Sequence, residues 1–442
     1  MHLVQLLADL FLSLWRGKID YTPPDHPSTW PWAIFKDVDM WQAHGAAVAA
    51  AGQYLPGSFD RKPRDPAQKI NTGYKTWEFQ IYIFGLGPAL LFNVLPQPYW
   101  RNYCRVVRAF RLINQHSISI ADLQAAHTAF NEWEVEFELL YYERRAERLH
   151  FIRPCVHQVS HLVTQTLQKG PPICYSQWTM ERTVGNLGQE IRQPSNPYAN
   201  LSREGVRRCQ VNALKAMIPE LDVPPRGIPS TAIDLGSGYV LLRKRDYRAV
   251  HPSRAETIAI EAYLGLEAHK IHRWARLRLP NGQIVRTAWR ETLRPPERPI
   301  RVSRNVKLVL GGDIRLAEVQ YFTQLAAEAG VGEDGPIWSW KNVAIVVMYS
   351  QPDTDLLDLS FQAVSSCAYL EDDIRVVNIK SIKAVVGMVP HTPRLPSGVV
   401  ENRFFLVEKP GLDIATFGVP YEGLGAQDDE DDDDEENMDI IE

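Results

Sequence analysis

The spacing of apolar positions divides the chain near Pro219. In residues 1–225, apolar side chains recur at intervals of three and four, which is typical of amphipathic helices. The clearest helix is predicted at 119–148, and a second one at 151–168. The first of these carries one apolar stripe, made of Phe130, Trp133, Phe137, Leu140 and Tyr141. This stripe predicts a helix that packs on a hydrophobic core.

Downstream of the proline-rich segment 223–229, short β-rich runs replace the helical pattern. Alternating runs at 274–279 and 284–289 flank Pro280-Asn281-Gly282-Gln283, and Asn-Gly between such runs is a strong hairpin signal. Further strands are predicted at 318–326, 343–349, 374–378, 382–389 and 404–408. Together these runs predict a small barrel or sandwich that is separate from the helical half.

The predicted fold class is therefore α+β, with several domains. The expected divisions are a helical region at 1–225, a basic connector with a β-hairpin at 226–306, a β-rich accessory domain at 307–425 and an acidic tail at 426–442. The last 15 residues contain eleven Asp or Glu and no Lys or Arg. Because like charges repel and nothing there can form a core, we expect the tail to be disordered.

Without its acidic tail, the chain has a positive net charge. The net charge is -5, so the chain without its tail carries about +6. The stretch 240–307 holds sixteen Lys or Arg against six acids, which favours a polyanion such as nucleic acid as the partner. The candidate nucleic-acid-binding residues are Arg243, Lys244, Arg245, Arg273, Arg276, Arg278 and Arg286. The alternative is that these residues are solvated charges around a β-rich domain.

The spacing of the cysteines and the length of the apolar runs indicate the cellular compartment of the protein. The five cysteines are odd in number and far apart, so they form neither a disulfide framework nor a Cys-x-x-Cys half-site. The longest apolar run, at 81–95, contains Gly85, Gly87 and Pro88 and is too short for a bilayer. We expect an intracellular protein with no signal peptide and no membrane partner.

The segment 150–201 contains the residues that could carry chemistry. His157 and His161 are four apart, so on a helix both rings would face the same way, as a shared metal requires. A pair of core or surface histidines is the alternative. Glu181 lies among apolar neighbours in Trp178-Thr-Met-Glu181-Arg182. It would either pair with a nearby arginine or bind a metal.

The chain resembles the C-terminal part of CACTA-type (En/Spm-like) DNA transposases of the form found in fungal genomes, over residues 1 to about 420. The motifs that carry this resemblance are Met1-His2-Leu3, Leu14-Trp-Arg-Gly17, Tyr54-Leu-Pro-Gly-Ser-Phe59, Ile70-Asn-Thr-Gly-Tyr-Lys75, Phe84-Gly-Leu-Gly-Pro88, the His157–His161 pair, Gln177-Trp-Thr-Met-Glu-Arg182 and Ser195-Asn-Pro-Tyr-Ala-Asn200.

The resemblance implies an RNase-H-like core in which two aspartates and one glutamate bind Mg²⁺ or Mn²⁺. By that resemblance Glu181 would be the final catalytic carboxylate. His157 and His161 would be half of a Zn²⁺ site whose other half is a Cys-x-x-Cys. The segment around Trp338-Ser-Trp340 resembles the accessory β domain that follows the catalytic region.

This sequence departs from the family pattern at two points. Both aspartates would precede Met1, and no Cys-x-x-Cys is present. We therefore expect a nuclear, transposase-derived DNA-binding protein that does not catalyse transposition alone. Its partners would be DNA and another copy or a complementary transposase subunit. The alternatives are a non-enzymatic chromatin or protein-interaction module and a non-functional transposon remnant.

Overall fold

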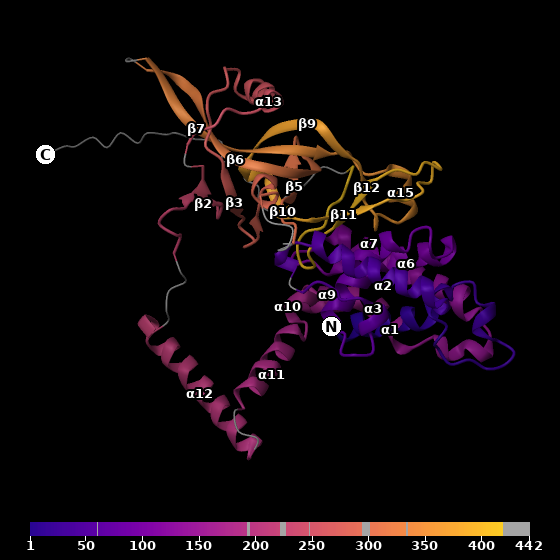
Figure 1. Cartoon of the computed structure of the whole chain (residues 1–442). Helices are drawn as coiled ribbons and strands as arrows, with labels where there is room; N and C mark the ends of the chain where they lie inside the picture. Colours follow the sequence, from indigo (N-terminus) through magenta and orange to yellow (C-terminus); the bar gives the residue numbers. More distant parts are fainter. Residues whose placement is uncertain are drawn as a thin grey trace.

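The computed structural model describes residues 1–59, 61–191, 195–221, 227–246, 248–293, 301–332 and 335–418. Helices make up the N-terminal half and strands dominate the C-terminal half (Figure 1), which confirms the predicted α+β class. The acidic tail at 426–442 lies outside the described residues.

The helical half is built around α1, α6 and α7. Its helices are α1 (His2–Trp15), α2 (Val38–Ala51), α3 (Pro66–Lys69), α4 (Thr76–Ile81), α5 (Gly87–Leu90), α6 (Gln97–Ile113), α7 (Ile120–Phe137), α8 (Pro154–Gln158), α9 (Leu162–Lys169), α10 (Pro172–Tyr175), α11 (Trp178–Glu190) and α12 (Pro197–Met217). Large aromatic side chains fill the core, and the indole N–H of Trp15 donates to the Tyr141 hydroxyl at 3.2 Å. A buried indole thus keeps a hydrogen-bond partner.

The stripe predicted on α7 is correct, whereas the length of that helix is not. Phe130, Trp133, Phe137 and Tyr141 are fully buried. The helix continues as a π-turn to Tyr142 and then stops, because the next two residues adopt left-handed φ angles of 54°. The helix predicted at 151–168 is likewise interrupted, by the 3₁₀ turn Val159–His161 between α8 and α9.

In the described residues, the strands form two antiparallel sheets. Their bounds are β1 (Ile233–Asp234), β2 (Val240–Arg245), β3 (Trp274–Arg278), β4 (Ile284–Val285), β5 (Asn305–Leu310), β6 (Asp313–Gly332), β7 (Gly335–Tyr349), β8 (Ser366–Cys367), β9 (Tyr369–Asn378), β10 (Ile382–Val385), β11 (Gly387–His391) and β12 (Arg403–Val407). The larger sheet has the order β1-β2-β3-β6-β5-β10, with β4 beside β3, and with β7 and then β9 added to β6. The smaller sheet has the order β11-β12-β8.

The structure confirms the hairpin predicted at Asn281-Gly282. Gly282 has a φ of +78°, a conformation that glycine adopts without steric cost, and the turn joins β3 to β4. The second strand is shorter than predicted, because residues 288–291 form the short helix α14 (Ala288–Glu291). Two further helices, α13 (Arg254–Leu264) and α15 (Thr354–Leu359), lie between strands. The basic connector thus belongs to the larger sheet.

One hydrophobic core joins the two halves. The core of α1, α6 and α7 also contains buried residues from the C-terminal part, namely Leu356, Ala363, Val364, Val389, Leu395, Phe405 and Val407. The guanidinium of Arg111 on α6 crosses this contact and donates to the carbonyl oxygens of Phe84, Gly85 and Ala363 at 2.7–3.0 Å. The C-terminal strands therefore pack directly on the helices, whereas the sequence pattern suggested a separate module.

Candidate nucleic-acid interface

The ribbon formed by β2, β3 and β4 presents a basic face. On β3, Ala275 and Leu277 are buried while Arg276 between them is exposed and Arg278 is half-buried. This alternation follows from the period of two along a strand, which sends successive side chains to opposite faces. Arg278 lies opposite Ile284 of β4, which is itself exposed. Arg276 and Arg278 thus leave the ribbon on its outer face.

Arg286 extends the same face. It stands two residues beyond Ile284, between the buried residues Val285 and Thr287, and its backbone N–H donates to the Ser303 carbonyl oxygen at 2.9 Å. Within the described residues, Arg276, Arg278 and Arg286 have no recorded ion-pair partner. Three guanidinium groups therefore lie on one face outside any ion pair among the described residues, although the charge of Arg286 also acts on Glu291 and opposes the rise of its pKa.

Arg273, which the sequence grouped with these arginines, has intramolecular partners. Its Nε lies 2.8 Å from Asp246 Oδ2, and its guanidinium stacks on the Trp289 ring at 4.5 Å. Because the Asp246 carboxylate already balances its charge, Arg273 attracts a phosphate less strongly than an arginine outside an ion pair does. The side chains of the other predicted residues, Arg243 to Arg245 on β2, lie outside the described part of the structure.

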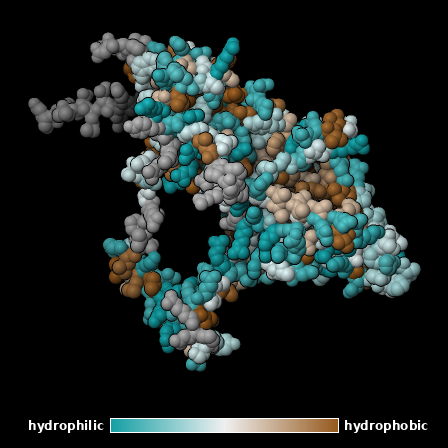
Figure 2. Space-filling view, viewed as in Figure 1, coloured by the Kyte–Doolittle hydropathy of each residue, from teal (hydrophilic) through white to brown (hydrophobic). Residues whose placement is uncertain are grey.

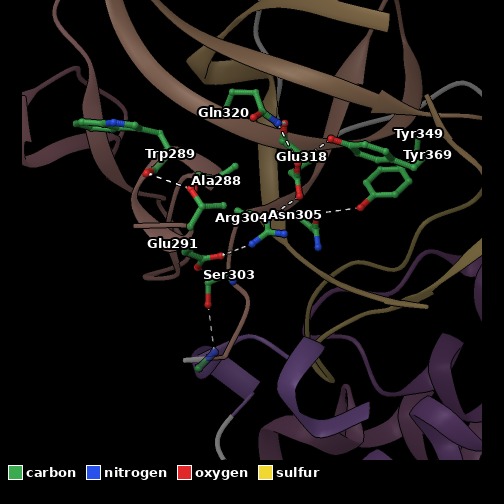
Figure 3. A network of polar contacts seen from close by, with 12 residues as sticks. Ala288, Trp289, Glu291, Ser303, Arg304, Asn305, Glu318, Gln320, Tyr349 and Tyr369 are labelled. Atoms are coloured by element: carbon green, nitrogen blue, oxygen red, sulfur yellow. Dashed lines mark hydrogen bonds and ion pairs between the residues drawn. The ribbon is translucent and has the colours of Figure 1, made fainter. Parts of the chain in front are cut away.

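A buried polar network supports the end of the ribbon (Figure 3). Arg304 lies between two carboxylates, with Glu291 of α14 at 3.2 Å and Glu318 of β6 at 2.6 Å. Glu291 also accepts the Ser303 N–H at 3.0 Å, and Tyr369 donates to Glu318 at 2.8 Å. Burial raises the pKa of Glu291, although the hydrogen bond from Ser303 and the Arg304 charge oppose that shift.

The network fixes α14 against β6 and holds the partly buried Arg304 between the two carboxylates. Sequence reasoning missed it, because its partners come from separate segments and share no spacing pattern. The one signal was the presence of charged residues in otherwise apolar strands. Its role is structural support, since the guanidinium occupies the space between the two carboxylates.

The two candidate zinc ligands lie side by side, as the four-residue spacing predicted. The rings of His157 and His161 are 4.8 Å apart and perpendicular, and both side chains are exposed. His157 Nδ1 lies 2.9 Å from Glu134 Oε1 on α7. In the described part of the chain, no group of three or more His, Cys, Asp or Glu side chains is placed to hold a metal ion.

Glu181 lies in the first turn of α11 and is exposed. Helices α11 and α12 form an arm that leaves the body of the protein (Figure 1), anchored where Trp178 packs edge-on against Trp77 at 5.3 Å. Figure 2 shows hydrophobic side chains on this arm, and the exposed ones on α12 include Leu214 and Met217. The described residues supply neither a carboxylate cluster nor an ion-pair partner for Glu181.

Comparisons with protein-family models, with curated proteins and with solved structures give no match. The resemblance to CACTA transposases therefore rests on the sequence motifs alone. In the described residues, no helix is both long and apolar enough to span a bilayer.

Proposed function

We propose that this chain is a transposase-derived DNA-binding protein that acts in the nucleus and does not cleave DNA on its own. The observation that carries the proposal is the outer face of the β2-β3-β4 ribbon, where Arg276, Arg278 and Arg286 have no ion-pair partner in the described part of the chain. Guanidinium groups bind phosphate oxygens with two parallel hydrogen bonds. Such contacts position a protein on a duplex without reading its sequence.

The proposal assigns different roles to the arginines of the stretch 240–307. Those on the outer face contact the phosphate backbone, whereas Arg273 and Arg304 hold the ribbon in shape through Asp246 and through the network of Figure 3. DNA affinity should therefore depend on the outer-face residues specifically, rather than on total charge.

Fluorescence anisotropy with a labelled 30-base-pair duplex, measured over a range of salt concentrations, tests this assignment. Each lost phosphate contact lowers the slope of log K against log salt by about 0.9, so the triple variant Arg276→Ala, Arg278→Ala, Arg286→Ala should lose about two to three units of slope. The control variant removes three exposed arginines elsewhere, at Arg61, Arg375 and Arg394. Equal slopes for the two variants would show that net charge alone attracts DNA and would refute the assignment.

Catalysis is a separate question. In the described residues, Glu181 is exposed and belongs to no group of three or more His, Cys, Asp or Glu side chains that could hold a metal ion. We therefore propose that the isolated chain has no strand-nicking activity with Mg²⁺ or Mn²⁺. Nicking that disappears in Glu181→Gln would overturn this part of the proposal and leave the DNA-binding part intact.

A further inference from the structure

The β6–β7 hairpin extends beyond the rest of the sheet (Figure 1). The two strands pair from Ala317↔Met348 to Gly332↔Gly335. In the described structure, β9 joins β7 only from Val343 onward, and β3 meets β6 at the single pair Trp274↔Phe322. The outer part of the hairpin is thus a two-stranded ribbon without neighbouring strands.

This outer part carries two exposed tryptophans on one face. Trp338 and Trp340 are 54% and 68% exposed, and they alternate with Ser339 along β7. On the partner strand, Glu328 lies opposite Trp338 and the small residue Ala326 lies opposite Trp340. Exposed indoles on a projecting element are typical of an interaction surface, because large apolar groups gain free energy by leaving water.

The charge of the hairpin indicates which class of partner would bind to this face. Residues 326–340 contain three acidic residues and no Lys or Arg. Of the acids, Glu328 lies in the described structure on the tryptophan face, whereas the following cation, Lys341, lies on the opposite face of β7. A phosphate backbone would be repelled by this charge, whereas a cation would be attracted. Tryptophan is the aromatic residue that binds cations most strongly through its ring face, and the Glu328 carboxylate lies across the ribbon from Trp338.

We propose that this face binds a basic peptide segment of a partner protein, with Lys or Arg side chains against the rings of Trp338 and Trp340. Alternate side chains on a strand are about 6.6–6.8 Å apart. An extended peptide with a cation at every second residue has the same spacing, so two of its cations could meet the two rings together. The site is separate from the β2-β3-β4 ribbon and does not depend on DNA binding there.

Fluorescence anisotropy with the full chain and a labelled 12-residue peptide of alternating Lys and Ser tests the proposal, with a Gln-Ser peptide as the neutral probe. The double variant Trp338→Ala, Trp340→Ala should weaken Lys-Ser binding at least tenfold, and Glu328→Lys should weaken it similarly by reversing the local charge. The double Phe variant should be intermediate, because phenylalanine binds cations less strongly than tryptophan. Ile337→Ala is the matched control: Ile337 is 55% exposed on the same strand but on the opposite face, so binding should stay within twofold.

The acidic C-terminal residues could also attract the basic peptide, and the same variants separate the two sources. Binding that persists unchanged in the double Ala variant and in Glu328→Lys would assign it to those residues and overturn the proposal. Equal binding of the Gln-Ser peptide, or competition by the oligonucleotide dT12 at the tryptophans, would overturn it as well. Circular dichroism on each variant establishes that the fold is retained.

Discussion

The shared core predicts that a residue of the C-terminal strands controls the stability of the helices. Phe405 of β12 is 1% exposed and belongs to the core of α1, α6 and α7. Replacing a fully buried phenylalanine by alanine costs about 3–5 kcal/mol, because apolar contacts are lost and a cavity remains. Phe405→Ala should therefore destabilise α6, although Phe405 lies almost 300 residues further along the chain.

Hydrogen exchange followed by mass spectrometry measures this effect directly. Since one decade of protection corresponds to about 1.4 kcal/mol, protection of the α6 amides should fall by about two to nearly four orders of magnitude. The matched control is Phe404→Ala, because the neighbouring side chain faces Tyr349 and Tyr369 in a different cluster.

The control variant should lower α6 protection much less than Phe405→Ala. Unchanged protection of α6 in Phe405→Ala would mean that the helices fold independently of β12. That result would refute a shared core.

Two further predictions concern buried polar groups. Burial lowers the pKa of both His44 and His391 to about 4. Between about pH 6.5 and 4 the unfolded chain takes up protons that the folded chain does not, so stability should fall by about 1.4 kcal/mol per pH unit for each histidine. Urea denaturation at pH 7, 6 and 5 gives the free energy of unfolding at each pH. The decrease of this free energy per pH unit should be smaller by that amount in His44→Gln, and an unchanged decrease would contradict the assignment. Arg111→Met leaves three carbonyl oxygens without their donor and should lose at least about 3 kcal/mol in the same assay at pH 7. Arg111→Lys should recover only part of this loss because an ammonium lacks the guanidinium fork, so full recovery would argue against the three-carbonyl role.

Local chemistry explains which parts of the fold were predictable. The turn at Asn281-Gly282 and the stripe on α7 were predicted because their signals are contained in a few neighbouring residues. The end of that helix had no such signal, since Glu143 and Arg144 are neither Gly nor Pro and still adopt left-handed φ angles. Just beyond this turn, Arg148 forms a buried ion pair with Asp25, at 2.6 Å. A local sequence pattern does not reveal a partner that lies so far away in the chain.

The candidate site was predictable in composition but not in detail. The basic stretch and its hairpin were evident, whereas nothing in the spacing separates Arg276, which is exposed, from Arg273, which pairs with Asp246. The length of β6 was also underestimated, because its outer part, with Gly330 and Gly332, is held by pairing with β7 rather than by strand propensity. Contacts with residues distant in the sequence therefore determine both which arginine is exposed and how far β6 extends.

The shared core also determines when the protein can fold during synthesis. The last buried core residue of the helices, Val163, leaves the ribosome about 240 residues before Val407 completes the same core. At a synthesis rate of about 5–20 residues per second, the apolar surface of the helices stays uncovered for roughly 12–50 s. During that interval, chaperones that hold apolar segments have the opportunity to bind, and any truncated product that ends before β11 leaves the ribosome with that surface exposed.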